Sequence, residues 1–140
     1  MLIKVEKIID AVFDLDMSFI VNKDDIKPQI EEFIRVAVNG DTIKTYLPIK
    51  ANLQPQKLGI LLYVLTNVRL IKFEIDKDGK INSSSFFLKT MTNIERKSID
   101  KDNVSVDIVF QNAVVGLRYA IANKKITEFF QMVETAQAGM

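Results

Sequence analysis

The sequence predicts an α+β fold in which two N-terminal helices precede seven antiparallel strands and one closing helix. Three observations lead to this prediction. Apolar residues recur at the helical period before about position 40, at the strand period from about 43 to 122, and at the helical period again near the C-terminus. Short strands at such regular spacing are typical of a barrel or sandwich, one end of which an amphipathic helix covers.

The first third of the chain is predicted to form a helical hairpin. The apolar stripe of its first helix consists of Leu2, Val5, Ile8, Ile9, Val12, Phe13 and Ile20. Residues 22–25 break this pattern and offer N-caps, and Pro28 is expected in the first turn of the next helix. Apolar Ile30, Phe33, Ile34 and Ala37 follow, and Gly40 ends the helix. A strand over 17–21 remains an alternative, and the hairpin must pack on another element.

Seven strands are predicted after Gly40, each with a two-residue alternation or a dense apolar run. They cover 43–49, 58–66, 69–76, 84–89, 92–99, 104–111 and 114–122. A loop with Pro48 and Pro55 is expected after the first, and Asp78-Gly79 is a hairpin turn signal. A last helix over 123–137 buries Ile126, Phe129, Phe130 and Val133, and Asn123 is its expected cap.

The second predicted strand is apolar on both faces. Leu58, Ile60, Leu62 and Val64 alternate with Leu61, Tyr63 and Leu65. Such a strand needs a cover on its outer face as well as its inner one. The helical hairpin or a second subunit would supply this cover. We therefore take Leu61, Tyr63 and Leu65 as candidate partner-binding residues.

The composition excludes several classes of chemistry. The 140 residues include no cysteine, histidine or tryptophan. A thiol nucleophile, a serine–histidine relay, a Cys/His zinc site and a disulfide are therefore absent. Glycine-rich nucleotide motifs are absent too, and the aspartate pairs at 14/16 and 100/102 lack convergent partners. Residues 74–81 imitate part of a calcium loop, but a hairpin turn is favoured. We predict no catalytic residues, no metal and no cofactor.

The formal charge of +1 hides an internal division. Residues 1–41 contain five basic and nine acidic residues, a net −4, so the other 14 basic and 9 acidic residues carry +5. Chance and the enrichment of aspartate at helix starts explain this split without a function. The alternative is that the acidic segment docks against, or masks, a basic face of the rest.

The N-terminus lacks the features of a signal peptide, and the longest apolar run, 60–65, is far shorter than a membrane span. We therefore expect a soluble, cytoplasmic protein. The absence of cysteine agrees with a reducing compartment without proving one.

The order of seven strands and one helix resembles the pleckstrin-homology (PH) superfold. The stretch 65–73, Leu-Thr-Asn-Val-Arg-Leu-Ile-Lys-Phe, is similar to the Thr-(Asn/Asp)-x-Arg-Leu-Ile hairpin of bacterial PH-like and GRAM-like domains. Residues 91–95 resemble the strand that follows in those families, and Phe129-Phe130 matches the aromatic position of their closing helix. The resemblance covers 41–137. It predicts a PH-like domain over 41–140, preceded by a helical extension over 1–40.

This resemblance implies a non-catalytic scaffold that binds peptides, proteins or lipid headgroups. A protein partner or a second copy of the chain is the favoured partner, and nucleic acid is not expected. The main alternative is binding of a membrane surface or anionic ligand, masked by the acidic segment. Its candidate residues, at positions matching the basic cluster of lipid-binding PH domains, are Lys44, Lys50, Lys57 and Lys72. A small phage- or plasmid-type effector or inhibitor is a further alternative.

Overall fold

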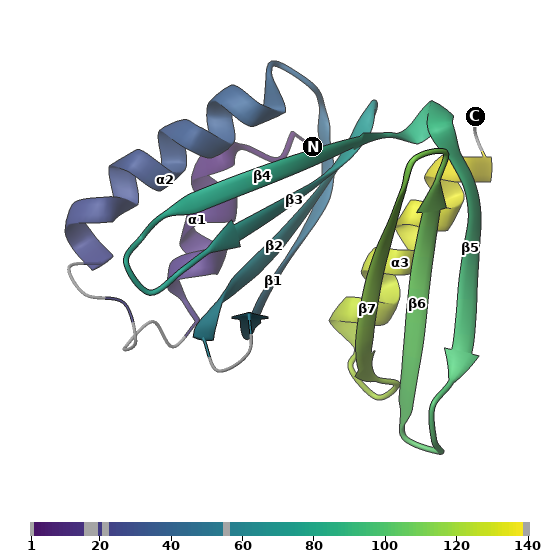
Figure 1. The fold of residues 1–140 in the computed structure, drawn as a ribbon. Helices are drawn as coiled ribbons and strands as arrows, with labels where there is room; N and C mark the ends of the chain where they lie inside the picture. The colour runs from purple at the N-terminus through teal and green to yellow at the C-terminus, as the bar shows by residue number, and fades with distance from the viewer. Residues whose placement is uncertain (1, 16–19, 21–22, 55–56, 139–140) are drawn as a thin grey trace. The chain divides into compact units, whose positions relative to one another are not determined.

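A computed structural model describes residues 2–15, 20, 23–54 and 57–138, except for the side chains of 52, 54 and 57. Within these residues the chain forms three α-helices, seven strands and one 3-10 turn, η1 (Figure 1). Their bounds are α1 Val5–Phe13, α2 Lys23–Val38, β1 Ile43–Gln54, β2 Lys57–Thr66, β3 Arg69–Ile75, β4 Ile81–Phe87, η1 Leu88–Thr90, β5 Met91–Ser98, β6 Asn103–Phe110, β7 Ala113–Ala120 and α3 Lys124–Ala138.

The predicted α+β class and element order are confirmed. The chain divides into two compact units, residues 1–85 and 86–140. The first holds a sheet of order β1-β2-β3-β4, except for the last two residues of β4, and the second holds a sheet of order β5-β6-β7. In the part of the chain that the structure describes, no strand of one sheet pairs with a strand of the other. The strands therefore form two antiparallel sheets and not a closed barrel, with the 3-10 turn η1 between β4 and β5.

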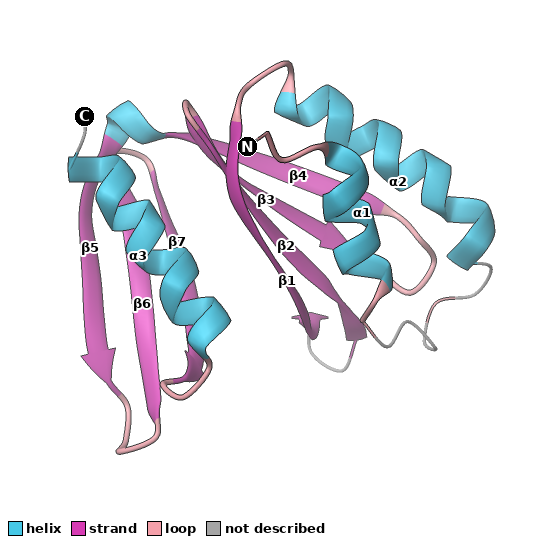
Figure 2. Cartoon of the chain, turned by 180° about the vertical axis from the view of Figure 1, so that it is seen from behind, coloured by secondary structure: helices cyan, strands magenta, loops and turns pink. Residues whose placement is uncertain are grey.

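In the first unit, α1 and α2 lie on one face of the sheet (Figure 2). Their buried side chains form one core with alternate residues of β2 and β3. Its members include Val5, Ile8, Ile9, Val12, Ile30, Ile34, Val38, Ile60, Leu62, Val64, Ile71, Phe73 and Ile75. The helical hairpin therefore covers the Ile60 side of β2, because strand side chains alternate between faces. Leu61, Tyr63 and Leu65 belong to the opposite face.

Two local predictions in the first unit need correction. Strand β1 runs through Pro48, which lies opposite Leu62 and was expected in a loop. Strand β1 is the edge of its sheet, where a missing backbone N–H costs no ladder bond. Helix α2 begins at Lys23, so Pro28 lies in its second turn and not in its first. The alternative strand over 17–21 falls on 17–19 and 21, which lie outside the described residues, and on Ile20, which is described as a bend.

The second unit consists of α3 packed on the sheet of β5, β6 and β7. The predicted stripe of Ile126, Phe129, Phe130 and Val133 is buried. The ring of Phe130 stacks on that of Tyr119 with their centroids 5.8 Å apart. The cap is confirmed as well, because the Asn123 side-chain oxygen accepts the Ile126 N–H at 3.2 Å. None of the helices in the described residues has both the length and the hydropathy of a membrane span.

Residues 76–80 form the predicted hairpin turn between β3 and β4. The Asp76 carboxylate accepts the backbone N–H groups of Asp78 and Lys80 at 2.9 and 3.0 Å. Gly79 has a φ of +80°, a conformation that costs a residue with a Cβ about 1 kcal/mol or more. A Cβ there would also lie 2.8 Å from the Ile26 side chain of α2. This turn therefore fixes how closely α2 approaches the β3–β4 hairpin.

We expect Gly79→Ala to destabilise the chain more than Gly40→Ala. Both glycines have positive φ, but a Cβ at Gly40 meets no described atom within 4 Å. Gly40→Ala should cost about 1 kcal/mol, and Gly79→Ala about 1–2 kcal/mol more, because Ile26 must shift. Urea unfolding of the two variants measures the difference. Equal free energies of unfolding would show that α2 does not rest on this turn.

Candidate functional site

The family-like stretch 65–73 is a structural clamp. Arg69 donates to the Asp41 carboxylate from Nε at 2.7 Å and from Nη2 at 3.3 Å, and both side chains are largely buried. The Thr66 hydroxyl donates to Asp41 at 2.9 Å and accepts the backbone N–H groups of Val68 and Arg69. These bonds join the end of the α2–β1 connection to the β2–β3 hairpin. Thr66 and Arg69, two residues of the stretch that carries the resemblance, therefore stabilise the fold.

The ion pairs of the acidic segment fall mostly on its own helices. The Lys27 amine lies 3.9 Å from Asp10, and the Arg35 guanidinium lies 3.1 Å from Glu6. The hydrogen bond from the Glu6 backbone and that from Arg35 hold the pKa of the Glu6 carboxyl below its usual range. The hydrogen bonds that Arg69 donates to the Asp41 carboxylate join the segment to a strand. Masking of a basic face by this segment stays a prediction.

The candidate partner-binding residues share one face of β2, as alternation requires. Leu61 is half-buried, whereas Tyr63 and Leu65 are each 1% exposed. Burial raises the pKa of Tyr63 to about 12, and the Glu74 carboxylate adds to the rise. Their part in partner binding stays a prediction.

The candidate anion-binding lysines are not gathered in one place. Lys50 lies opposite Ile60 in the β1–β2 ladder, on the helix-covered side of the sheet. Lys72 lies opposite Tyr63, on the other side, and its amine is 3.4 Å from the Glu74 carboxylate. Lys44 is exposed, and the side chain of Lys57 lies outside the described residues.

The aspartates considered for acid–base chemistry have structural partners or separate positions. The Asp100 carboxylate accepts the backbone N–H groups of Asp102 and Asn103 at 2.8 and 2.9 Å, which lowers its pKa and closes the β5–β6 turn. Asp14 follows the end of α1, and Asp16 lies outside the described residues. Across the described part of the chain, no three acidic side chains gather where a metal ion would bind.

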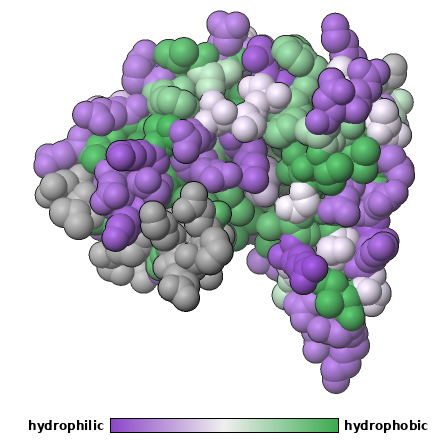
Figure 3. Space-filling model, viewed as in Figure 1, coloured by the Kyte–Doolittle hydropathy of each residue, from purple (hydrophilic) through white to green (hydrophobic). Residues whose placement is uncertain are grey.

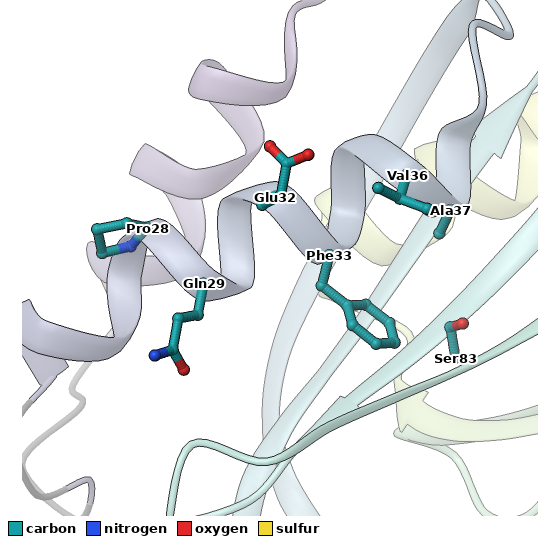
Figure 4. A pocket seen from close by; sticks show the side chains of 7 residues that line it. All are labelled: Pro28, Gln29, Glu32, Phe33, Val36, Ala37 and Ser83. Carbon is teal, nitrogen blue, oxygen red and sulfur yellow. The ribbon is translucent and has the colours of Figure 1, made fainter.

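An apolar groove lies between α2 and β4 in the first unit. It encloses about 650 Å³ and is lined by Pro28, Gln29, Glu32, Phe33, Val36, Ala37 and Ser83. Figure 4 shows the Phe33 ring directed toward the strand that carries Ser83, while Glu32 points the other way. Val36 is 67% exposed and Phe33 37%. Green hydrophobic surface interrupts the purple hydrophilic surface along this helix (Figure 3).

Packing on the sheet explains why the groove exists. Ile30 and Ile34 are fully buried against the sheet, and the Phe33 ring meets Phe73 edge-on with their centroids 6.3 Å apart. Val36 lies past this contact, on the side of β4, where the residue that lines the groove is the short Ser83. Apolar surface at a helix–strand seam is thus left open.

Sequence reasoning did not identify this groove. Phe33 and Ala37 were assigned to the buried stripe of the second helix, and Val36 and Ser83 were given no role. The available signal was Val36, an apolar residue outside the stripe of Ile30 and Ile34. It indicates a second, weaker apolar strip on the same helix.

We expect the burial of Tyr63 to make stability depend on pH in the alkaline range. The folded chain holds the phenol proton more tightly than the unfolded chain, whose tyrosine titrates near 10. This contribution is complete below about pH 10 and is lost as the pH rises through about 12. The free energy of unfolding should therefore fall more steeply there for the wild type than for Tyr63→Phe, measured by urea titration. Parallel curves for the two chains would contradict the burial of this hydroxyl.

Comparisons with known proteins identify the fold. No family profile matches the chain, and no curated protein matches it in sequence. A crystal structure of a DUF1696 family protein with a pleckstrin-homology domain from Shewanella loihica PV-4 is similar, with a TM-score of 0.53 and 14% identity over 84% of this chain and 98% of that one. The hSac2 domain from human phosphoinositide phosphatase Sac2 is similar at a TM-score of 0.56 and 10% identity, over 86% and 85%. The chain therefore has a PH-like fold, as the strand order and hairpin motif predicted.

Proposed function

We propose that this chain is a non-catalytic binding module that engages a protein partner through the groove between α2 and β4. The observation that carries the proposal is the open apolar seam at Phe33 and Val36. Exposed apolar surface of this kind, in a concave and mostly preformed site, is typical of a binding surface. The PH-like fold supports a binding role, although a fold alone does not assign one.

The chemistry of the groove supports a macromolecular partner over a small charged ligand. Its one ionisable lining residue among those described, Glu32, points away from Ser83. Lysines of the alternative anion site lie on different sides of the sheet. Self-association remains a version of the same proposal, with a second copy as the protein partner.

Site-specific photocrosslinking tests this function. We expect p-benzoylphenylalanine in place of Val36, in the full chain in its native host, to give a discrete adduct heavier than the 15.9 kDa chain on irradiation. The matched control replaces Val114 of β7, which is 60% exposed but lies in the second unit. It should give no such band, because the groove does not include it.

The mass of the adduct identifies the kind of partner. A band at about twice the mass of the chain would indicate a second copy, and any other discrete mass a different protein. Absence of an adduct at position 36, or equal adducts at both positions, would contradict binding at this groove.

A further inference from the structure

The two edges of the first sheet are built differently. Strand β1, at one edge, carries Lys44, Pro48 and Lys50 and has two register irregularities. Lysine, proline and bulges are the devices by which proteins prevent another strand from pairing with an edge. Strand β4, at the other edge, has the sequence Ile-Asn-Ser-Ser-Ser-Phe-Phe over 81–87, without a charge or a proline. The β4 edge is thus the one that lacks protection.

The hairpin register shows which backbone groups of β4 face outward. The Asp76 N–H donates to the Lys80 carbonyl at 3.0 Å, so these two residues form a hydrogen-bonded pair. Continuing the antiparallel register places Ser83 opposite Phe73 as a non-hydrogen-bonded pair. The N–H and C=O of Ser83 then point away from β3. No described strand occupies that side of β4.

The apolar groove lies directly beside this edge. Ser83 and Phe33 both line the groove. If a strand were added to β4, every second side chain of that strand would therefore enter the groove beneath α2. A second hollow of about 500 Å³, which shares Gln29 and Phe33 with the groove, extends it toward the 78–80 turn. The seam is therefore long enough to receive more than one side chain of an extended segment.

Acidic residues outnumber basic ones along α2, four to three. Lys27 meets Asp10 of α1 and lies over the Phe13 ring, and Arg35 meets Glu6 of α1. The Arg35 guanidinium is shared among three carboxylates, because it also lies 3.4 Å from Glu31 and 3.7 Å from Glu32. Glu32 lines the groove, and Asp25, seven residues earlier, falls on the same side of the helix. The rim beside the groove is therefore acidic, which complements a basic partner.

We propose that an extended peptide of another protein adds to β4 as a further antiparallel or parallel strand. Its alternate apolar side chains fill the groove beneath Phe33 and Val36, and a lysine or arginine of the peptide reaches past the groove to the acidic rim at Glu32 and Asp25. This inference rests on the proposed function and names its partner chemistry. Backbone hydrogen bonds to Ser83 supply affinity, and the groove and acidic rim supply selectivity.

The test uses the full chain to select from a random peptide library displayed on phage. We expect selected peptides to share two apolar residues at alternate positions and at least one basic residue. Synthetic copies of these peptides then serve as the probe in fluorescence anisotropy titrations. Ser83→Pro, which removes the outward N–H, should weaken binding about tenfold or more. The matched variant Ser83→Ala, which keeps that N–H, should retain more affinity than Ser83→Pro, so that the difference between the two variants reports the backbone N–H.

Two further measurements keep the result independent of how the proline variant folds. Two versions of the selected peptide are N-methylated at alternate residues, one at the odd and one at the even positions. One version should lose binding and the other should keep it, because only one of the two sets of N–H groups faces β4. Glu32→Gln should weaken binding a few-fold at low salt and reduce its salt dependence.

Several results would overturn the inference. The first is that the library yields no enrichment of peptides with alternating apolar residues and a basic residue. The second is that both N-methylated versions of the peptide lose binding equally. The third is that Ser83→Pro and the wild type bind the peptide with equal affinity. A second copy of the chain can also compete with the peptide for β4. If wild-type dimers form and Ser83→Pro abolishes them, the strand that adds to β4 comes from a second copy of the chain and not from another protein. A crosslink at position 36 combined with any of these results would leave the proposed function standing and remove strand addition alone.

Discussion

Apolar packing of α1 and α2 on one face of β2 and β3 is the constraint on which the rest of the first unit depends. The face that carries Ile60, Leu62 and Val64 is filled by the helices, so Leu61, Tyr63 and Leu65 are assigned to the opposite face. Complete burial of Ile30 and Ile34 sets the rotation of α2. That rotation leaves Phe33 and Val36 beside β4, where the sheet ends.

Polar contacts hold this packing in register. The bonds of Asp41 with Thr66 and Arg69 tie the exit of α2 to the β2–β3 hairpin, and Gly79 lets the next hairpin approach Ile26. Both contacts lie at connections between elements. The resemblance to PH-like domains rests partly on Thr66 and Arg69, which hold Asp41. Because these residues stabilise the fold, the resemblance predicts the fold but does not identify a ligand.

Much of the fold was predictable because its periodicities are strong. The alternation of Ile71, Phe73 and Ile75 and the stripe of Ile126, Phe129 and Phe130 were both assigned correctly. The continuation of the strand through Pro48 was not predicted. A strand accommodates a proline where it forms the edge of a sheet, and the sequence does not reveal that β1 is an edge. The groove was missed for a similar reason. Its lining comes from α2 and from Ser83 of β4, and local patterns do not show that the two are neighbours.

Amide hydrogen exchange at β4, followed residue by residue by NMR, tests the central claim most directly. In the free chain the Ser83 N–H should exchange fast, whereas its neighbours Asn82 and Ser84, which face β3, should be protected. A peptide selected for binding should slow amide exchange at Ser83 and shift the NMR signals of Phe33 and Val36. Protection of Ser83 in the free chain, or slowing by the peptide confined to the second unit, would contradict an open binding edge at β4.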